Sequence, residues 1–262
     1  MKVSIITATY NSASTIHKTI GSIAEQDYKD IEFIVVDGNS TDDTLAIIRS
    51  HTDTIHKWIS EPDTGMYQAI NKGIQVSTGD IIGILNSDDF YHRKDAISQI
   101  VQTFESTGTE SVLADVLIVQ RTDETKVHRY YSSGHFRPWK FRFGFMPAHP
   151  TFFVKREILE KIGPYKENYK LTSDFEFLIR YLWTNKIKCH YIPIDLLSMR
   201  RGGMSSPSLK NIFLKNRENL QGLRENNIYS NYLFISSRYL IKALYMLWYR
   251  IKHVIFGKDF NH

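Results

Sequence analysis

Short apolar runs rich in β-branched residues alternate with helical patterns along the first third of the chain. Residues 3–8 and 31–36 are such runs, each followed by polar residues, and they predict buried parallel strands. Between them, apolar residues recur at helical spacing from Ile16 to Ile23. The alternation continues with a helix from Ser40, a strand over 55–59, a helix over 66–77 and a strand over 80–85. This order predicts an α/β fold with a doubly wound, mostly parallel sheet, which binds ligands at the carboxyl ends of its strands.

The second half of the chain is less regular. Its patterns predict strands over 112–120 and 188–192, helices over 154–162 and 173–183, and helical segments throughout 208–256. Nine aromatic residues fall within 130–153. Aromatic rings in such a stretch either line a ligand site or pack in the core.

Composition and charge exclude several classes of protein. The chain has 262 residues, 42% of them hydrophobic and 23% charged, which is typical of a folded domain and unlike a disordered segment. Its one cysteine, Cys189, excludes an intramolecular disulfide and a thiolate metal cluster. Residues 208–262 hold nine Lys or Arg and three Asp or Glu, a charge of +6, so residues 1–207 carry −1 of the net +5. A near-neutral first part argues against nucleic-acid binding.

No segment predicts export or a membrane span. The apolar run at the start stops at Thr7, which is too short for the hydrophobic region of a signal peptide. No stretch reaches the ~20 uncharged apolar residues that a spanning helix needs. We therefore expect a cytoplasmic protein, either free or on the inner face of the cell membrane.

Residues 206–262 predict a basic amphipathic helical tail, a C-terminal extension of the sheet domain. Arg238, Lys242 and Arg250 form a cationic stripe on a helix that is otherwise apolar and aromatic. The aromatic residues near the stripe are Tyr245, Trp248 and Tyr249. Such a helix either lies on an anionic membrane surface through residues 230–256 or packs on the protein itself or a second subunit, and its cations favour the membrane.

Polar residues follow four of the predicted strands at the point where each ends. They are Thr9-Tyr10-Asn11, Asp37-Gly38-Asn39, Glu61-Pro62-Asp63 and Asn86-Ser87-Asp88-Asp89. Because the carboxyl ends of parallel strands meet at one edge, these groups predict a single crevice, which in this kind of fold recognises a nucleotide. The glycine-rich signatures of dehydrogenases and P-loop proteins do not occur in the sequence.

The acidic residues at two of these strand ends suggest specific roles in binding. Adjacent Asp88 and Asp89 repel each other unless a cation lies between them, which indicates Mg²⁺ or Mn²⁺; the alternative is a solvated turn. Asp37 either contacts a ribose or base, or caps the helix that follows.

Five segments in order resemble glycosyltransferase family 2, the inverting nucleotide-sugar transferases with the GT-A fold. They are Ser4–Asn11 (SIITATYN), Val35–Thr44 (VVDGNSTDDT), Glu61–Gly73 (EPDTGMYQAINKG), Leu85–Phe90 (LNSDDF) and Leu171–Arg180 (LTSDFEFLIR). The resemblance covers residues 1–205. It implies a glycosyltransferase domain there, with a nucleotide-binding half over 1–90 and an acceptor half over 91–205.

The resemblance also implies how a nucleotide-sugar is held. Thr9 and Asp37 would hold the nucleoside, and Asp63 with Asn71 would shape the same pocket. The other expected contacts to the nucleotide-sugar are Tyr10, Asn11, Asn86, Ser87, Arg200 and Arg201.

Catalysis is implied for a separate set of residues. Asp88 matches the metal ligand of the family's Asp-x-Asp motif and would bridge the cation to the diphosphate, with Asp89 as a second ligand. Asp174 matches the general base that deprotonates the acceptor hydroxyl. Glu176 competes for that role, but two positions along a helix it points elsewhere. His149 either contacts acceptor or diphosphate, or is held in a turn between prolines.

Two positions depart from the family pattern. Asn86 stands where the Asp-x-Asp motif has its first carboxylate, and Gly38 stands where the family usually has a second acid. The second departure leaves the base open among uracil, guanine and thymine, with UDP favoured.

The predicted function is a metal-dependent inverting glycosyltransferase. It would move a hexosyl or N-acetylhexosaminyl group from a nucleotide-sugar to a lipid-linked or oligosaccharide acceptor in cell-surface polysaccharide synthesis. The alternatives are a membrane-bound scaffold of the same fold with little turnover, and a nucleotidyltransferase.

Overall fold

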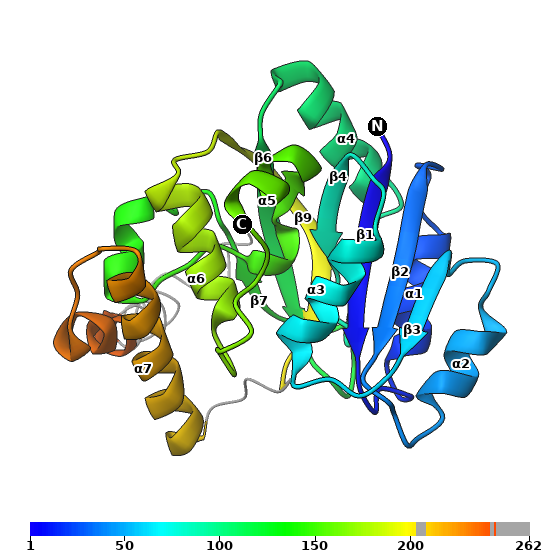
Figure 1. The fold of residues 1–262 in the computed structure, drawn as a ribbon, viewed down its shortest axis with the longest axis horizontal. Coiled ribbons are helices and arrows are strands. Elements are labelled where there is room, and N and C mark those ends of the chain that lie inside the picture. The colour runs from blue at the N-terminus through cyan, green and yellow to red at the C-terminus, as the bar shows by residue number, and fades with distance from the viewer. Residues whose placement is uncertain (203–207, 242–243, 245–262) are drawn as a thin grey trace, which may run out of the picture.

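The computed structural model describes residues 1–202, 208–241 and 244, and its core is one mixed sheet (Figure 1). The strands run in the order β3-β2-β1-β4-β8-β6-β9-β5, and β7 pairs with β6. They are β1 (Val3–Thr9), β2 (Ile31–Asp37), β3 (Lys57–Ser60), β4 (Ile81–Ile84), β5 (Asp89–Phe90), β6 (Ser111–Val119), β7 (Val127–Tyr131), β8 (Phe153–Lys155) and β9 (Cys189–Arg200).

Helices cover both faces of the sheet. The α-helices are α1 (Ile16–Ala24), α2 (Thr44–Ser50), α3 (Met66–Val76), α4 (Ala96–Thr107), α5 (Arg156–Ile162), α6 (Ser173–Ile179) and α7 (Leu209–Glu225). Shorter turns are η1 (Pro138–Phe143), η2 (His149–Thr151) and the π-helix η3 (Arg180–Thr184). One apolar core includes buried side chains of α1, α2 and α4, and a second includes those of α3, α5 and α6. The result is a three-layer α/β/α arrangement.

The first half of the sheet confirms the predicted parallel strands. β1 pairs in parallel with β2 and β4, and β2 with β3. All seven residues of β2 are buried, as expected for a strand covered on both faces. The register places Thr9 opposite Asp37, so two of the predicted site residues end neighbouring strands.

The second half departs from the mostly parallel prediction. There β8 is antiparallel to β4 and β6, β5 is antiparallel to β9, and only β6 with β9 is parallel. Strands of two or three residues, such as β5 and β8, are too short to leave a periodic signal. The last predicted strand extends to Arg200 instead of ending at 192.

Helix α7 packs against α6, although the sequence placed it in the tail beyond residue 205. Ser208 caps its start by accepting a hydrogen bond from the Asn211 amide at 3.1 Å, and Leu220 and Leu223 are buried. A Cβ at Gly222 would lie only 3.3 Å from the Cβ of Glu176, so glycine lets the two helices approach closely. Residues 232–241 form a further helical segment.

The predicted cationic stripe is wrong at Arg238. This side chain is 8% exposed and donates to the Gly144 carbonyl at 2.6 Å and to Asn216 Oδ1 at 2.8 Å. Its guanidinium is held by groups of the protein itself and does not face solvent. Lys242 and Arg250, with the predicted aromatic residues beside them, lie outside the described residues. Within the described ranges, no helix has the length and apolarity needed to cross a bilayer.

Candidate active site

The ends of β1 and β2 form the floor of the predicted nucleoside site. Asp37 is fully buried and its carboxylate accepts hydrogen bonds from the Ser40 amide at 3.1 Å, the Ser40 hydroxyl and the Ser60 hydroxyl at 2.7 Å. Beside it, the Thr9 hydroxyl is buried and makes no hydrogen bond within the described residues. Buried hydroxyls are normally paired, so the unsatisfied Thr9 group is consistent with a partner supplied by a ligand.

Asp63 and Tyr10 flank this floor. A Cβ at Gly38 would lie 2.6 Å from Asp63 Oδ2 and 3.5 Å from the Tyr10 ring, so the absence of a side chain there lets both approach the end of β2. Asp63 also accepts a hydrogen bond from the Gly65 amide at 2.9 Å, just before α3 begins. Tyr10 is 61% exposed and presents its ring to solvent, where a planar base can stack on it.

Asn11 and Ser87 tie the loops around this edge together. Asn11 has a positive φ of 48°, and its Oδ1 accepts a hydrogen bond from the Thr41 amide at 2.9 Å. The Ser87 hydroxyl lies 3.0 Å from that of Ser12. The structure thus brings the loop after β4 against the loop after β1, as the strand order predicts.

The two acidic residues after β4 lie in different environments. The Asp89 amide donates to the Asn86 carbonyl at 3.0 Å, and Asn86 Nδ2 donates to Asp89 Oδ2 at 2.8 Å. Asp89 is 2% exposed, and burial together with the neighbouring Asp88 carboxylate raises the pKa of Asp89 to about 8. Asp88 is half-buried and accepts no hydrogen bond at its carboxylate from the described residues.

This donor set fits a divalent cation only in part. The described residues contain no group of three His, Cys, Asp or Glu side chains that could hold a metal alone. Mg²⁺ and Mn²⁺ bound with a nucleoside diphosphate need only one or two carboxylates, because phosphate and water oxygens complete the shell. Asp88 fits that requirement, and the roles of Asp88 and Asp89 as metal ligands both stay predictions.

Arg200 contacts the backbone of Asp88. It is 7% exposed, donates to the Asp88 carbonyl and forms an ion pair with Glu124, which also pairs with Lys18. Arg201 is exposed. An open hollow of about 560 Å³ is lined by residues that include Lys18, Phe90 and Glu124. The geometry therefore supports Arg200 as a brace of the acidic loop, and its contact with a diphosphate stays a prediction.

Asp174 lies in the first turn of α6, and its side chain contacts Tyr67 of α3. Its Oδ1 accepts hydrogen bonds from the Phe175 amide at 2.8 Å and from the Tyr67 hydroxyl at 3.3 Å. Tyr67 follows Asp63 by four residues and lies in the first turn of α3. This contact joins the predicted base, from the second half of the chain, to the element that begins at the nucleoside edge.

Asn71 and His149 both contact Tyr165; for His149 this agrees with the second of its two predicted alternatives, a histidine held in a turn. The Asn71 amide donates to the Tyr165 carbonyl and to Glu167 Oε1, both at 2.8 Å, and its Oδ1 accepts from the Tyr165 amide at 3.1 Å. His149 is 9% exposed with Nε2 2.7 Å from the Tyr165 hydroxyl, and burial lowers the pKa of the imidazole. The geometry favours structural roles for both residues around Tyr165.

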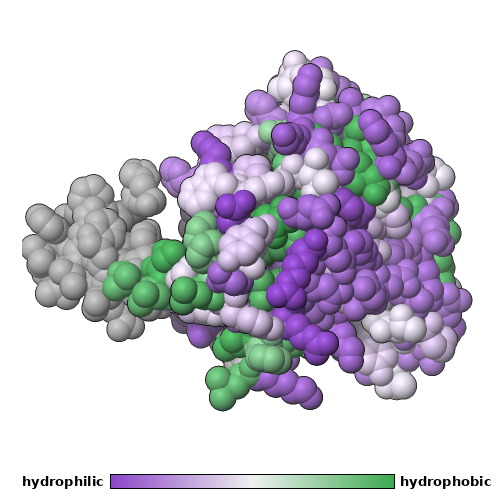
Figure 2. All heavy atoms as spheres, turned by 60° about the vertical axis from the view of Figure 1, so that its left-hand side comes forward, coloured by the Kyte–Doolittle hydropathy of each residue, from purple (hydrophilic) through white to green (hydrophobic). Residues whose placement is uncertain are grey.

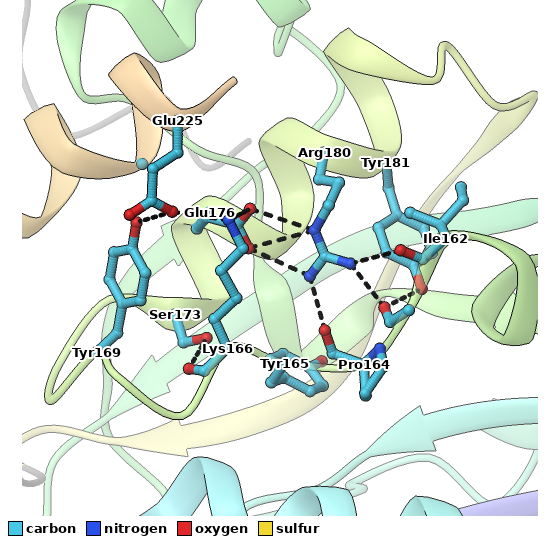
Figure 3. A network of polar contacts seen from close by, with 12 residues as sticks. Ile162, Pro164, Tyr165, Lys166, Tyr169, Ser173, Glu176, Arg180, Tyr181 and Glu225 are labelled. Carbon is cyan, nitrogen blue, oxygen red and sulfur yellow. Dashed lines mark hydrogen bonds and ion pairs between the residues drawn. The ribbon is translucent and has the colours of Figure 1, made fainter. Parts of the chain in front are cut away.

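Glu176 belongs to a buried network on a different side of α6 (Figure 3). Its carboxylate is fully buried and lies 3.0 Å from Lys166 Nζ and 3.2 Å from Arg180 Nη2. Arg180 also donates to the carbonyls of Ile162, Gly163 and Pro164, and Lys166 pairs with Glu225 at 2.7 Å. These contacts bind the loop between α5 and α6 to α7 and occupy Glu176.

Comparison with known proteins identifies the family. Residues 4–163, more than half of the chain, match the family model described as "Glycosyl transferase family 2". The chain belongs to this family. A glycosyltransferase of Mycobacterium bovis named for PGL/p-HBAD biosynthesis is 28% identical over 217 residues, covering 81% of this chain and 82% of the relative. An uncharacterized glycosyltransferase of Mycobacterium tuberculosis is 32% identical over 183 residues, 68% of each chain.

Solved structures confirm the GT-A-like fold of this glycosyltransferase. S. aureus TarS 1-349 in complex with UDP-GlcNAc has a TM-score of 0.65 at 20% identity, covering 85% of this chain and 66% of that one. The mannosyltransferase PcManGT from Pyrobaculum calidifontis, in complex with GDP-Man and Mn²⁺, has a TM-score of 0.63 at 20% identity, covering 86% and 63%. The chain thus spans slightly less than two thirds of these two structures.

Two residues near the predicted base were missed in the sequence. Tyr67 lies inside a quoted family segment, but only the fold shows that it reaches Asp174. Glu218 lies in α7, which the sequence placed in a basic tail, and its carboxylate contacts the start of α6. No local signal identifies a residue whose partner is 46 positions away.

Proposed function

We propose that this family 2 enzyme is a metal-dependent inverting glycosyltransferase that uses a UDP-sugar. Its product would be a hexosyl or N-acetylhexosaminyl group on a lipid-linked or oligosaccharide acceptor in cell-surface polysaccharide synthesis. The observation that carries the proposal is the contact of Asp174 with Tyr67. It brings a carboxylate from the acceptor half to the helix that starts at the nucleoside edge.

The chemistry assigns separate tasks to the two halves. Thr9, Asp37 and Asp63 bind and orient the nucleoside, while Asp88 would hold the cation. That cation would supply positive charge to neutralise the departing diphosphate. Asp174 takes the proton from the acceptor hydroxyl. As it does so, the hydroxyl oxygen bonds to the anomeric carbon, and the bond between that carbon and the diphosphate oxygen breaks. Attack opposite the leaving group inverts the anomeric configuration.

The identities of the nucleotide and the metal rest on the solved relatives and on the site. One of those structures holds UDP-GlcNAc and another holds GDP-Man with Mn²⁺, so both support a nucleotide-sugar and the second supports Mn²⁺. The half-buried Asp88 carboxylate and the unpaired Thr9 hydroxyl are the corresponding features of this chain. UDP remains the favoured nucleotide.

An anionic membrane surface on the cytoplasmic face is the proposed location of the enzyme. Exposed apolar side chains gather at the C-terminal helices (Figure 2), including Phe213 of α7 and Leu233, Leu240 and Leu244 beyond it. The three leucines are 77%, 63% and 55% exposed and are spaced to share one helix face. With the +6 charge of residues 208–262, this face fits the interface of a bilayer that contains anionic lipid.

A thermal-shift screen tests the proposed activity. UDP-, GDP- and dTDP-sugars are added with and without Mn²⁺, and a ligand that binds only the folded state raises its apparent stability. We expect a UDP-sugar to raise the Tm in a Mn²⁺-dependent way and to be hydrolysed slowly to UDP. Binding without any hydrolysis would favour a scaffold, and release of pyrophosphate from a nucleoside triphosphate would favour a nucleotidyltransferase.

A further inference from the structure

The Asp174 carboxylate is held on one of its two oxygens. Within the described residues, both of its hydrogen bonds, from Tyr67 and from the Phe175 amide, go to Oδ1. Tyr67 is 3% exposed, and burial together with Asp174 raises the pKa of its phenol. The phenol therefore stays protonated and serves as a permanent hydrogen-bond donor. Oδ2 is left as the oxygen that can take a proton from the acceptor.

A second group holds the backbone from which Asp174 projects. The Glu218 carboxylate, 6% exposed on α7, accepts hydrogen bonds from the amides of Lys170, Leu171 and Thr172 at 2.8–2.9 Å and from the Thr172 hydroxyl at 3.1 Å. All four donors lie just before the first residue of α6. A carboxylate that satisfies several amides at a helix start fixes the path of the chain there.

Helix α7 is close to the predicted base itself. Lys215 lies one turn before Glu218 on this helix. Burial lowers the pKa of Lys215, and the negative charge of the Asp174 carboxylate raises it in part. Nearer the end of the helix, the exposed Glu225 contacts side chains of the loop between α5 and α6, accepting from Lys166 at 2.7 Å and from Tyr169 at 2.9 Å (Figure 3), and among the described residues it makes no hydrogen bond with the backbone just before α6.

We propose that Tyr67 and Glu218 are positioning residues for Asp174, so that α7 is part of the catalytic apparatus. Tyr67 sets the orientation of the carboxylate by binding Oδ1, and Glu218 sets the position of the backbone that carries it. The proposal rests on the proposed role of Asp174 as general base. It assigns to α7 a function separate from membrane binding.

The physical consequence is a selective loss of turnover. Displacing a reacting group by about 1 Å can lower the rate of a reaction by roughly a hundredfold, because the productive geometry is then rarely populated. The proposed nucleotide contacts come from polar groups at the strand ends of the first half, and the hydrogen bonds of Tyr67 and Glu218 go instead to α6 and the residues just before it. Donor affinity should therefore be independent of both residues.

The experiment compares Tyr67→Phe and Glu218→Gln with the wild-type chain. Tyr67→Phe removes only the hydroxyl. Glu218→Gln keeps the shape but points an NH₂ group at backbone N–H donors. Glu225→Gln is the matched control, because it changes an exposed carboxylate of the same helix, whose partners are the Lys166 and Tyr169 side chains and not the backbone at the start of α6. Hydrolysis of UDP-GlcNAc, UDP-glucose or GDP-mannose with Mn²⁺ gives kcat, with water as acceptor, and Tm shifts give donor affinity.

We expect kcat to fall roughly tenfold to a hundredfold in both test variants, with donor affinity unchanged, and to stay within about twofold in the control. In an Asp174→Asn background, neither test substitution should lower kcat further. The proposal would be overturned if Tyr67→Phe had the same kcat as wild type. It would also be overturned if Glu218→Gln and Glu225→Gln lost kcat to the same extent, in proportion to their loss of Tm. If Glu218→Gln does not fold, Tyr67→Phe decides.

The base assignment fails separately from the positioning proposal. If Asp174→Asn hydrolyses donor at the wild-type rate, Asp174 is not the base, and the proposed mechanism is overturned. If Asp174→Asn is inactive while Tyr67→Phe and Glu218→Gln turn over normally, the base stands and only the positioning roles are overturned.

Discussion

Asp174 and Glu176 lie two residues apart on α6, yet their carboxylates have different partners. Asp174 is half-buried and accepts the Tyr67 hydroxyl at 3.3 Å, whereas Glu176 is fully buried between Lys166 and Arg180. A general base must reach the acceptor hydroxyl, and only the Asp174 carboxylate retains exposed surface. The two residues therefore make a matched pair for testing the mechanism.

Asp174→Asn keeps the side-chain shape but cannot accept the proton. We expect sugar transfer, or donor hydrolysis in its place, to fall by roughly 10²–10⁴. Donor affinity and its Mn²⁺ dependence should be retained, because Asp174 is not among the residues proposed to bind the nucleotide or the cation. Steady-state rates measured beside Tm shifts with UDP-sugar check both statements. A parallel loss of affinity and rate would mean that Asp174 binds the nucleotide.

Glu176→Gln should affect stability and leave the chemical step largely intact. Removing one charge from a buried ion-pair network leaves its partners uncompensated, which typically costs about 3–5 kcal/mol. The partially exposed Lys166 will reduce that cost by reaching water. Denaturant unfolding measures the loss, and the rate per folded molecule should stay within a few-fold of wild type. An inactive but stable Glu176→Gln would identify Glu176 as the base.

Asp88→Asn and Asp89→Asn should separate metal binding from support of the loop. Asp88→Asn is expected to abolish most of the Mn²⁺-dependent Tm shift with UDP-sugar. Asp89→Asn should lose less of it, because the Asp89 carboxylate is buried and bonded to Asn86. Thermal shifts with donor, at several Mn²⁺ concentrations, distinguish the two. Equal donor binding by Asp88→Asn and wild type would contradict the assignment of the metal ligand.

The fold of residues 1–90, the proposed nucleotide-binding half, could be predicted because its signals are local. The apolar runs of β1 and β2 form strands that are buried on both faces. The polar residues that follow each run lie at the carboxyl edge of the sheet, so the sequence marks that edge directly. The parallel register then brings Thr9 beside Asp37. Asp63 lies close to Gly38 because the two residues follow β3 and β2, which also pair in parallel.

The rest of the chain, after residue 90, could be predicted only in outline because its contacts are long-range. Glu218 and Arg238 lie in helical patterns whose charges indicate a solvated or lipid-facing surface. Both side chains are buried instead, because each satisfies backbone groups of a distant loop. Sequence periodicity reports which face of a helix is apolar, but it cannot report which charged side chain finds a buried partner.

Glu32 provides a prediction about stability and pH. It is 2% exposed; although burial raises its pKa, hydrogen bonds from Ser4, Lys57 and Thr78 outweigh that effect and hold the pKa of Glu32 well below its usual range. Glu32→Gln should lower the free energy of unfolding at pH 7 by about 2–4 kcal/mol.

The sign of the pH dependence follows from the lowered pKa of Glu32. The ionised carboxylate stabilises the fold above its unfolded pKa, and this contribution is lost as the pH falls toward the folded pKa. The difference between wild type and Glu32→Gln should therefore be largest near neutral pH and should narrow below about pH 4.5. Urea unfolding at pH 7, 5 and 3.5 measures it. A difference that is constant with pH would contradict the role of the charge.

The C-terminal helices should bind membranes through leucines and not through Arg238. Replacing both Leu233 and Leu240 by serine removes two exposed apolar side chains, each worth about 1.5–3 kcal/mol when buried in lipid, so vesicle binding should weaken at least tenfold. Because both side chains are exposed in the folded chain, its Tm should change little.

Arg238→Gln should do the reverse. It should lower the Tm, because the hydrogen bonds to Gly144 and Asn216 are lost, while vesicle binding is retained. Cosedimentation with vesicles of phosphatidylglycerol and phosphatidylcholine measures the binding. Unchanged binding by the double variant would mean that this apolar face contacts protein instead of lipid.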